Sequence, residues 1–134
     1  MKKRNYVRRT IGVIICSLPV VLAISSILWD KEVSNTSYAT GLILIVLSIL
    51  VGLLNINLLS IKPRLYKHKH KTIEGYKFIS GLPIFGTMLQ VFGCVTAFGN
   101  DVVGLLAVLT ILIDADGLFW IPVITWHDSS LWDS

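Results

Sequence analysis

Four long apolar runs separated by short polar connectors dominate the pattern of the chain. The runs cover approximately residues 11–29, 39–61, 78–98 and 102–122. As a helix, each is long enough to cross a hydrocarbon core of about 30 Å at 1.5 Å per residue. Only helices and closed barrels satisfy the backbone inside a bilayer, and these runs lack the two-residue alternation of barrel strands. The pattern therefore predicts an all-α fold, an integral-membrane four-helix bundle that forms a single domain over residues 1–134.

The composition supports this interpretation. Hydrophobic residues make up 54% of the chain, and the mean hydropathy is +0.73. A soluble domain of 134 residues has too little interior to bury that much apolar surface. We expect the first run to be an uncleaved span, because it is long for a signal-peptide core and no clear cleavage site follows it.

The net charge of +4 is concentrated at the ends of the predicted spans. One basic cluster precedes the first run, and the other fills the longest connector, residues 62–77. By the positive-inside rule both clusters face the cytoplasm, which also places the C-terminus there. Basic residues in such positions do not predict nucleic acid as a partner. We expect contacts with anionic lipid headgroups from Lys62, Arg64, Lys67, Lys69 and Lys71.

Two carboxylates interrupt the fourth run. Asp114 and Asp116 lie in the stretch "LTILIDADGLFWIPVITW", residues 109–126. An ionised carboxylate inside a bilayer costs at least about 2.5–3.5 kcal/mol unless a partner or a proton offsets it. On a regular helix these two side chains would point roughly 200° apart. Gly117 and Pro122 allow the helix to distort, so we expect the fourth helix to be broken near Asp114–Gly117.

Polar residues of all four spans fall at a similar depth, about 6–14 Å from the cytoplasmic ends of the helices. We expect these residues to form a polar cluster inside the bundle and close to the cytoplasm. Three interpretations stay open: a functional polar site, a structural lock in which the aspartates pair with Lys62 or Arg64, or a fourth span with different ends. The predicted cluster comprises Ser17, Asn55, Asn57, Thr87, Asp114 and Asp116.

Other motifs add little chemistry. His68 and His70 lack further ligands at metal-binding spacing, and the two cysteines lie singly in apolar runs. The chain carries no recognisable nucleophile–base set or phosphate-binding loop, so we expect no cofactor, no metal and no enzymatic activity. Gly93 and Ala97 form a small-xxx-small pair, which favours close helix packing within one chain or between protomers.

In its size, its four spans, its scant loops and the late "DADGLFW" break at residues 114–120, the chain resembles small bacterial multi-pass inner-membrane immunity and accessory proteins. This resemblance implies a non-enzymatic protein that acts by protein contact in the bilayer, for example immunity against a membrane-active toxin. A small oligomeric ion or proton channel or transporter that uses the aspartates is the alternative, and a holin-like protein is a second. The expected partners are membrane lipid and either another membrane protein or further copies of the chain.

Overall fold

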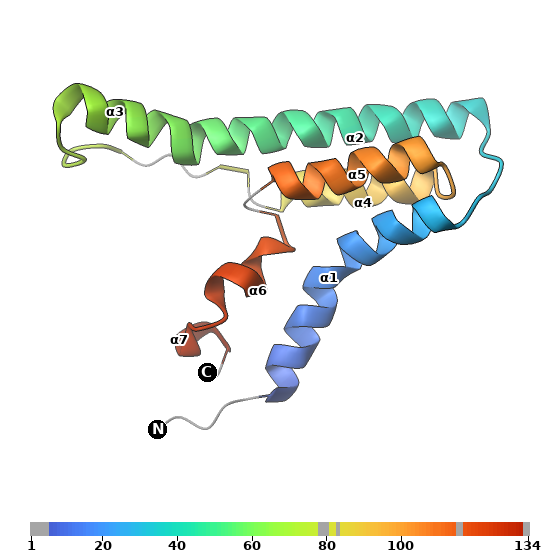
Figure 1. Ribbon diagram of the computed structural model, residues 1–134, viewed down its shortest axis with the longest axis horizontal. Coiled ribbons are helices and arrows are strands. Elements are labelled where there is room, and N and C mark those ends of the chain that lie inside the picture. Colours follow the sequence, from blue (N-terminus) through green and yellow to red (C-terminus); the bar gives the residue numbers. More distant parts are fainter. Residues whose placement is uncertain (1–5, 78–80, 83, 115–116, 133–134) are drawn as a thin grey trace.

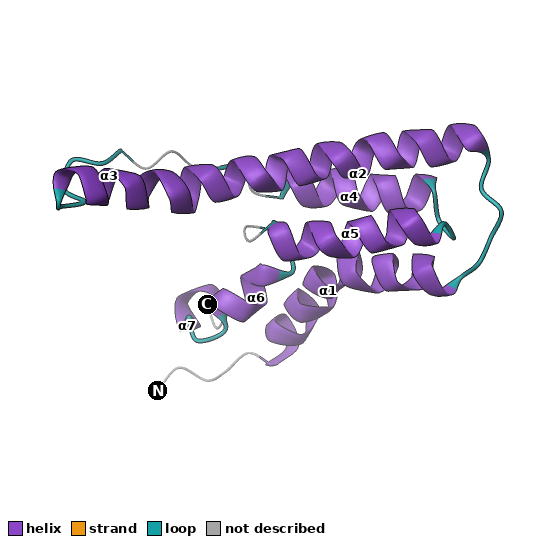
Figure 2. Ribbon diagram, turned by 45° about the horizontal axis from the view of Figure 1, so that its top comes forward, coloured by secondary structure: helices purple, strands orange, loops and turns teal. Residues whose placement is uncertain are grey.

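The computed structural model describes residues 6–77, 81–82, 84–114 and 117–132. All regular elements in this part of the chain are helical, which confirms the all-α prediction (Figure 2). The elements are α1 (Tyr6–Leu28), α2 (Asn35–Ile56), the π-helical segment η1 (Asn57–Ile61), α3 (Lys62–His70), α4 (Phe85–Thr96), α5 (Asp101–Ile113), α6 (Trp120–Thr125) and α7 (Ser129–Trp132).

Helices α2, α4 and α5 run side by side, and α1 joins them at one end before it bends away (Figure 1). The most extensive pairings are those of α2 with α4 and of α1 with α5. Pro19 lies inside α1 and is buried. A proline removes one helical hydrogen bond and clashes with the preceding turn, so it explains the bend. The N-terminal half of α1 is thereby directed toward α6.

The longest helical segment differs from the prediction. The sequence pattern predicts a basic loop over residues 62–77, but one continuous segment of 36 residues runs from Asn35 to His70. Lysine and arginine are good helix formers, so the basic run extends the helix. Pro63 cannot donate a backbone hydrogen bond, and the π-helical turn η1 directly before it accommodates this gap. The helix ends only at Lys71, whose φ of 58° is left-handed.

The predicted break in the fourth span is present. Helix α5 ends at Ile113 and α6 begins at Trp120, so the interruption lies where Asp114–Gly117 predicted it. The fourth predicted span, residues 102–122, is therefore divided between α5 and the start of α6. Helix α5 has 13 residues, which corresponds to about 20 Å, less than the thickness of a hydrocarbon core.

The third span is also shorter than predicted. Helix α4 begins at Phe85, whereas the apolar run predicts a span over residues 78–98. Residues 78–80 and 83 lie outside the described part of the chain. Ile84, directly before the helix, has a left-handed φ of 69°, which a β-branched residue rarely adopts. This conformation marks a sharp change of chain direction where α4 starts.

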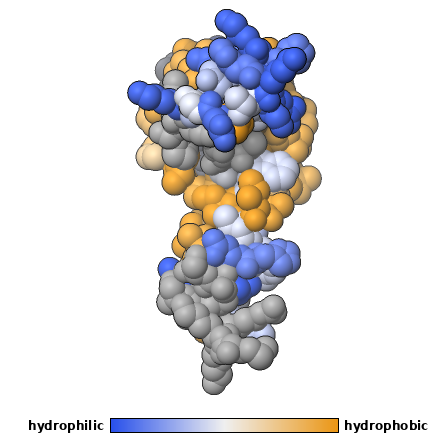
Figure 3. All heavy atoms as spheres, turned by 90° about the vertical axis from the view of Figure 1, so that its left-hand side faces the viewer, coloured by the Kyte–Doolittle hydropathy of each residue, from blue (hydrophilic) through white to orange (hydrophobic). Residues whose placement is uncertain are grey.

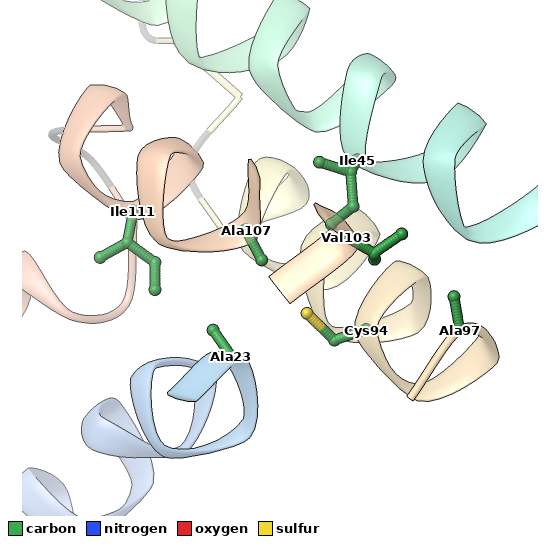
Figure 4. Close-up of a cluster of buried hydrophobic side chains, with 7 residues drawn as sticks. All are labelled: Ala23, Ile45, Cys94, Ala97, Val103, Ala107 and Ile111. Carbon is green, nitrogen blue, oxygen red and sulfur yellow. The ribbon is translucent and has the colours of Figure 1, made fainter. Parts of the chain in front are cut away.

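Small residues fill the interface between α2 and α4. A Cβ atom added at Gly41 would lie 2.6 Å from the Cβ of Ala97 and 2.9 Å from the carbonyl oxygen of Gly93. The predicted Gly93 and Ala97 pair therefore packs against α2 of the same chain. Figure 4 shows the core, in which alanine and cysteine side chains are the majority and which α1, α2, α4 and α5 surround. The cluster consists of Ala23, Ile45, Cys94, Ala97, Val103, Ala107 and Ile111.

Large apolar side chains lie mainly on the outside. Leu112 is 63% exposed and Phe92 is 57% exposed. Many polar groups are instead buried, the reverse of the usual distribution in a soluble protein. Viewed from the α3 end, Figure 3 shows hydrophilic residues gathered on that end and apolar surface around them. By length and composition, α1 and the segment from α2 to α3 are each able to cross a membrane. The buried polar residues are Arg9, Ser26, Ser48, Asn55, Thr87, Gln90, Thr110 and Asp114.

The contact between α2 and α4 predicts the sign of a mutational effect. Helix propensity alone makes Gly41→Ala stabilising by about 1 kcal/mol. The added methyl group has no room against Ala97, so we expect Gly41→Ala to lower the free energy of unfolding by about 1–3 kcal/mol. Denaturant titration in detergent micelles measures this value. Thr40→Ala, on the exposed side of the same helix, is the control and should change it by less than about 0.5 kcal/mol. Stabilisation by Gly41→Ala would contradict the close approach.

Candidate functional site

Four of the buried polar side chains gather where α4 begins and α5 ends. Asn55 comes from α2, Thr87 and Gln90 come from α4, and Asp114 is the residue directly after α5. Each of these four side chains is at most 4% exposed. We call this set the polar junction. It contains Asn55, Thr87 and Asp114 of the predicted cluster and adds Gln90.

Asn55 makes the central contacts of the polar junction. Its Nδ2 donates to Oδ1 of Asp114 at 3.1 Å. Its Oδ1 accepts from the backbone N–H of Leu82 at 2.8 Å, and its Nδ2 also donates to the Leu82 carbonyl at 3.4 Å. Leu82 precedes α4 and lies outside any helix. One side-chain amide therefore bonds to both backbone groups of a residue that has no helical hydrogen-bond partners.

Asp114 closes α5 and faces the first turn of α4. Its N–H donates to the carbonyl of Thr110 at 2.8 Å, which completes the last turn of the helix. A Cβ atom added at Gly86 would lie 2.7 Å from Oδ2 of Asp114, so the carboxylate lies directly beside the start of α4. The N–H groups at the N-terminus of a helix carry partial positive charge. This helix end and the Asn55 amide together stabilise a carboxylate that burial would otherwise penalise.

Thr87 contacts the segment between α5 and α6. Its Oγ accepts from the backbone N–H of Leu118 at 3.2 Å, in the segment between α5 and α6. A Cβ atom added at Gly117 would lie 3.1 Å from this Oγ and 3.1 Å from Oδ2 of Asp114. The absence of a side chain at Gly117 is therefore what lets the chain pass so close to both oxygen atoms.

Trp120 satisfies a further backbone group. Its Nε1 donates at 2.8 Å to the carbonyl of Ile111, one of the terminal carbonyls of α5. The last carbonyls of a helix have no donor four residues later, so they need partners of this kind. The polar junction and Trp120 together supply hydrogen bonds to the end of α5, to the segment before α4 and to the segment between α5 and α6.

Gln90 is the residue that the sequence analysis missed. In the described part of the chain its Nε2 is buried and has no hydrogen-bond partner. Gln90, Thr87 and Asp114 line a cavity of about 10 Å³, and Pro19 of α1 closes it. A space of this size holds about one water molecule. The signal was available in the sequence, because Gln90 follows Thr87 by three residues and shares its helix face.

The other predicted cluster residues lie elsewhere. The hydroxyl of Ser17 donates to the carbonyl of Ile14 in its own helix at 2.8 Å, and α1 reaches the polar junction through Pro19 instead. Asn57 is exposed on η1. Asp116 lies outside the described residues. The groove beside Asn57 has a volume of about 440 Å³ and is lined by Leu53, Leu54, Asn57, Leu58 and Lys62.

The structural-lock interpretation pairs the aspartates with Lys62 or Arg64, and the structure does not place these two cations beside Asp114. Lys62 and Arg64 are exposed side chains of α3. The neutral amide of Asn55 makes the contact to Asp114 that they were expected to make. A neutral donor avoids the cost of removing a second charge from water.

Comparison of the chain with protein-family models, with curated proteins and with solved structures gives no match. Over the described ranges, no three His, Cys, Asp or Glu side chains come together as a metal-binding group. The role of the polar junction is therefore inferred from its hydrogen bonds. Asn55 and Thr87 bond to the backbone of non-helical segments, and Asp114 bonds to Asn55. The main chemical task of this arrangement is to hold the start of α4 and the end of α5 against α2.

Two neighbouring asparagines test this assignment. Asn55→Ala leaves the backbone of Leu82 and the buried Asp114 carboxylate without the amide, so we expect the free energy of unfolding to fall by about 2–4 kcal/mol. Asn57→Ala removes the same group from an exposed position and should change it by less than about 0.5 kcal/mol. Denaturant titration followed by circular dichroism measures both variants. Equal effects of the two substitutions would contradict the assigned role of Asn55.

Proposed function

We propose that this chain is a multi-pass protein of the bacterial inner membrane that acts without catalysis, by contact with another membrane protein inside the bilayer. One observation carries the proposal, namely the reversed distribution of apolar and polar side chains. Lipid tails would cover exposed side chains such as Phe92 and Leu112. Helices in lipid associate through small residues and interhelical hydrogen bonds, and Gly41, Gly93 and Asn55 occupy such contacts.

The interrupted helices fit the same proposal. Helix α4 has 12 residues and α5 has 13, which gives lengths of about 18–20 Å in a hydrocarbon core of about 30 Å. Non-helical segments would complete these two crossings. Non-helical backbone is tolerated at membrane depth only where protein or water satisfies it. The polar junction supplies that satisfaction through Asn55 and Thr87.

Contacts of Arg9 support cytoplasmic placement of the N-terminal end of α1. Arg9 donates from Nη1 to the carbonyl of Trp126 at 3.1 Å, and its guanidinium carbon lies 5.0 Å from the centre of the Trp126 ring. Tryptophan and arginine are typical of membrane interfaces, and arginine marks the cytoplasmic side. Trp132 packs nearby against Gly12, where an added Cβ would lie 2.3 Å from its ring.

Protein contact is favoured over conduction through a single chain. A conducting path needs a continuous series of polar or hydrated sites. The polar junction faces a cavity of about 10 Å³, and two of its side chains are committed to backbone hydrogen bonds. The apolar outer surface is then the part of the molecule that would bind a partner. The specific form that we propose is immunity, in which this surface binds and blocks a membrane-active toxin.

Membrane placement predicts a labelling pattern. We expect the protein to resist extraction by alkaline carbonate, because its helices are embedded in lipid. In a background with Cys16→Ala and Cys94→Ala, a membrane-impermeant maleimide should label Ser37→Cys from outside the cell. It should label Lys69→Cys only after the membrane is opened. Release by carbonate, or labelling of both positions from outside, would overturn the placement.

Protein contact predicts a cross-linking pattern. A photo-reactive amino acid at exposed Phe92 should give a discrete adduct with a protein that co-purifies in stoichiometric amount. The same probe at Ala107, which is 0% exposed, is the control and should give none. Adducts with lipid alone, or only with further copies of the chain, would contradict the proposal. Ion flux in proteoliposomes that Asp114→Asn abolishes, with the variant still folded, would favour the channel instead.

A further inference from the structure

The amide of Gln90 is buried without the hydrogen bond that such a group needs. The side chain is 2% exposed, and its Nε2 has no hydrogen-bond partner among the described residues. Native proteins rarely leave a buried donor without an acceptor, and ordered water commonly takes that role. The Gln90 amide therefore indicates a bound acceptor that is not a protein atom.

A small cavity at the polar junction provides the space for such an acceptor. Its volume is about 10 Å³, and Gln90, Thr87 and Asp114 are its polar lining residues. Pro19 of α1 and Phe119 are among the apolar residues that enclose it. One water molecule needs about this much space and about two to four polar partners. The cavity is too small for a larger ligand.

The oxygen atoms of Asp114 and Thr87 converge beside Gly117, which also lines the cavity. A Cβ atom added at Gly117 would lie 3.1 Å from Oδ2 of Asp114 and 3.1 Å from Oγ of Thr87. The two oxygens are therefore separated by no more than twice this distance, which one water molecule can bridge with two hydrogen bonds. Thr87 Oγ accepts from the N–H of Leu118 and keeps its own proton and a second lone pair for this contact.

This set of donors and acceptors suits water better than a cation. Water can accept from the N–H of Gln90 and donate to the carboxylate of Asp114. If the amide is turned by half a rotation, water donates to its Oε1 instead, so both orientations suit water. A cation cannot accept from an amide N–H. Hard cations such as Ca²⁺ also take about six or more oxygen ligands, more than the three polar side chains of the lining supply.

We propose that the polar junction binds one water molecule, which accepts from Nε2 of Gln90 and donates to the carboxylate of Asp114, with the Thr87 hydroxyl as a third contact. The bound water links α4 to the end of α5. It also adds a hydrogen-bond donor to the one that the Asn55 amide offers to the buried carboxylate. The site goes beyond the proposed function, because it requires neither a partner protein nor contact with lipid.

The first test observes the water directly on the full chain in detergent micelles. Gln90 is the single glutamine of the sequence, so isotopic labelling of glutamine side-chain nitrogen gives the amide signals of this residue alone. We expect a rotating-frame cross-peak between the amide protons and water. Its sign should be that of dipolar contact with a long-lived water and opposite to that of proton exchange.

The second test removes the amide. Gln90→Met keeps the length of the side chain, and we expect relaxation dispersion of the solvent oxygen nucleus to count about one long-lived water fewer. The equilibrium constant for unfolding should rise by about tenfold, because the Asp114 carboxylate loses its water. Val95→Met places the same side chain on the exposed face of α4. This control should keep the water count and change the constant by less than about threefold.

Several results would overturn the assignment of a bound water. The first is the lack of a dipolar cross-peak from Gln90 in the folded protein, and the second is an unchanged water count in Gln90→Met. The third is a lower unfolding constant in Gln90→Met, which is expected when a buried amide without any partner is removed. A shift of the Gln90 signal when sodium chloride replaces choline chloride at constant ionic strength would assign a cation instead.

Discussion

The hydrogen bonds of the Asn55 side chain are the contacts on which the rest of the structure depends. They connect α2 to the backbone of Leu82 before α4 and to the carboxylate of Asp114 after α5. Two interrupted helices leave several backbone groups without helical partners. The Asp114 carboxylate is buried, and a buried polar group without a partner costs about 1–3 kcal/mol. The Asn55 amide therefore allows non-helical chain before α4 and after α5 to pack against α2.

The glycines of the apolar runs make room for this arrangement. Gly86 and Gly117 lie so close to Oδ2 of Asp114 that an added Cβ would be 2.7 Å and 3.1 Å from it. Gly52 brings α2 into ordinary van der Waals distance of the same residue, with an added Cβ 3.5 Å from the Cβ of Asp114. Gly41 and Gly93 let the first half of α2 and the last half of α4 approach each other. Close packing and the buried carboxylate are thus two consequences of the same small residues.

Depth along the helices was predictable from the sequence, but the direction of each side chain was not. Counting residues from span ends placed Asn55, Thr87 and Asp114 together, as the structure has them. The same count included Asn57, which is exposed, because residues two apart on a helix point roughly 200° apart. The extension of α2 through α3 was missed for another reason. Basic residues before a return of the chain resemble a loop in composition, although their helix propensity is high.

The polar junction also determines the direction of the extension that α3 forms. Asn55 lies in the last turn of α2, directly before η1, where the hydrogen-bond pattern changes to accommodate Pro63. Among the described elements, α3 pairs extensively only with η1, and the chain that follows α3 contacts it through Tyr66. The direction of α3 is therefore fixed by α2, and α2 is held against α4 and α5 at Asn55. A buried amide inside the bundle thus sets the position of the exposed lysines at the end of α3.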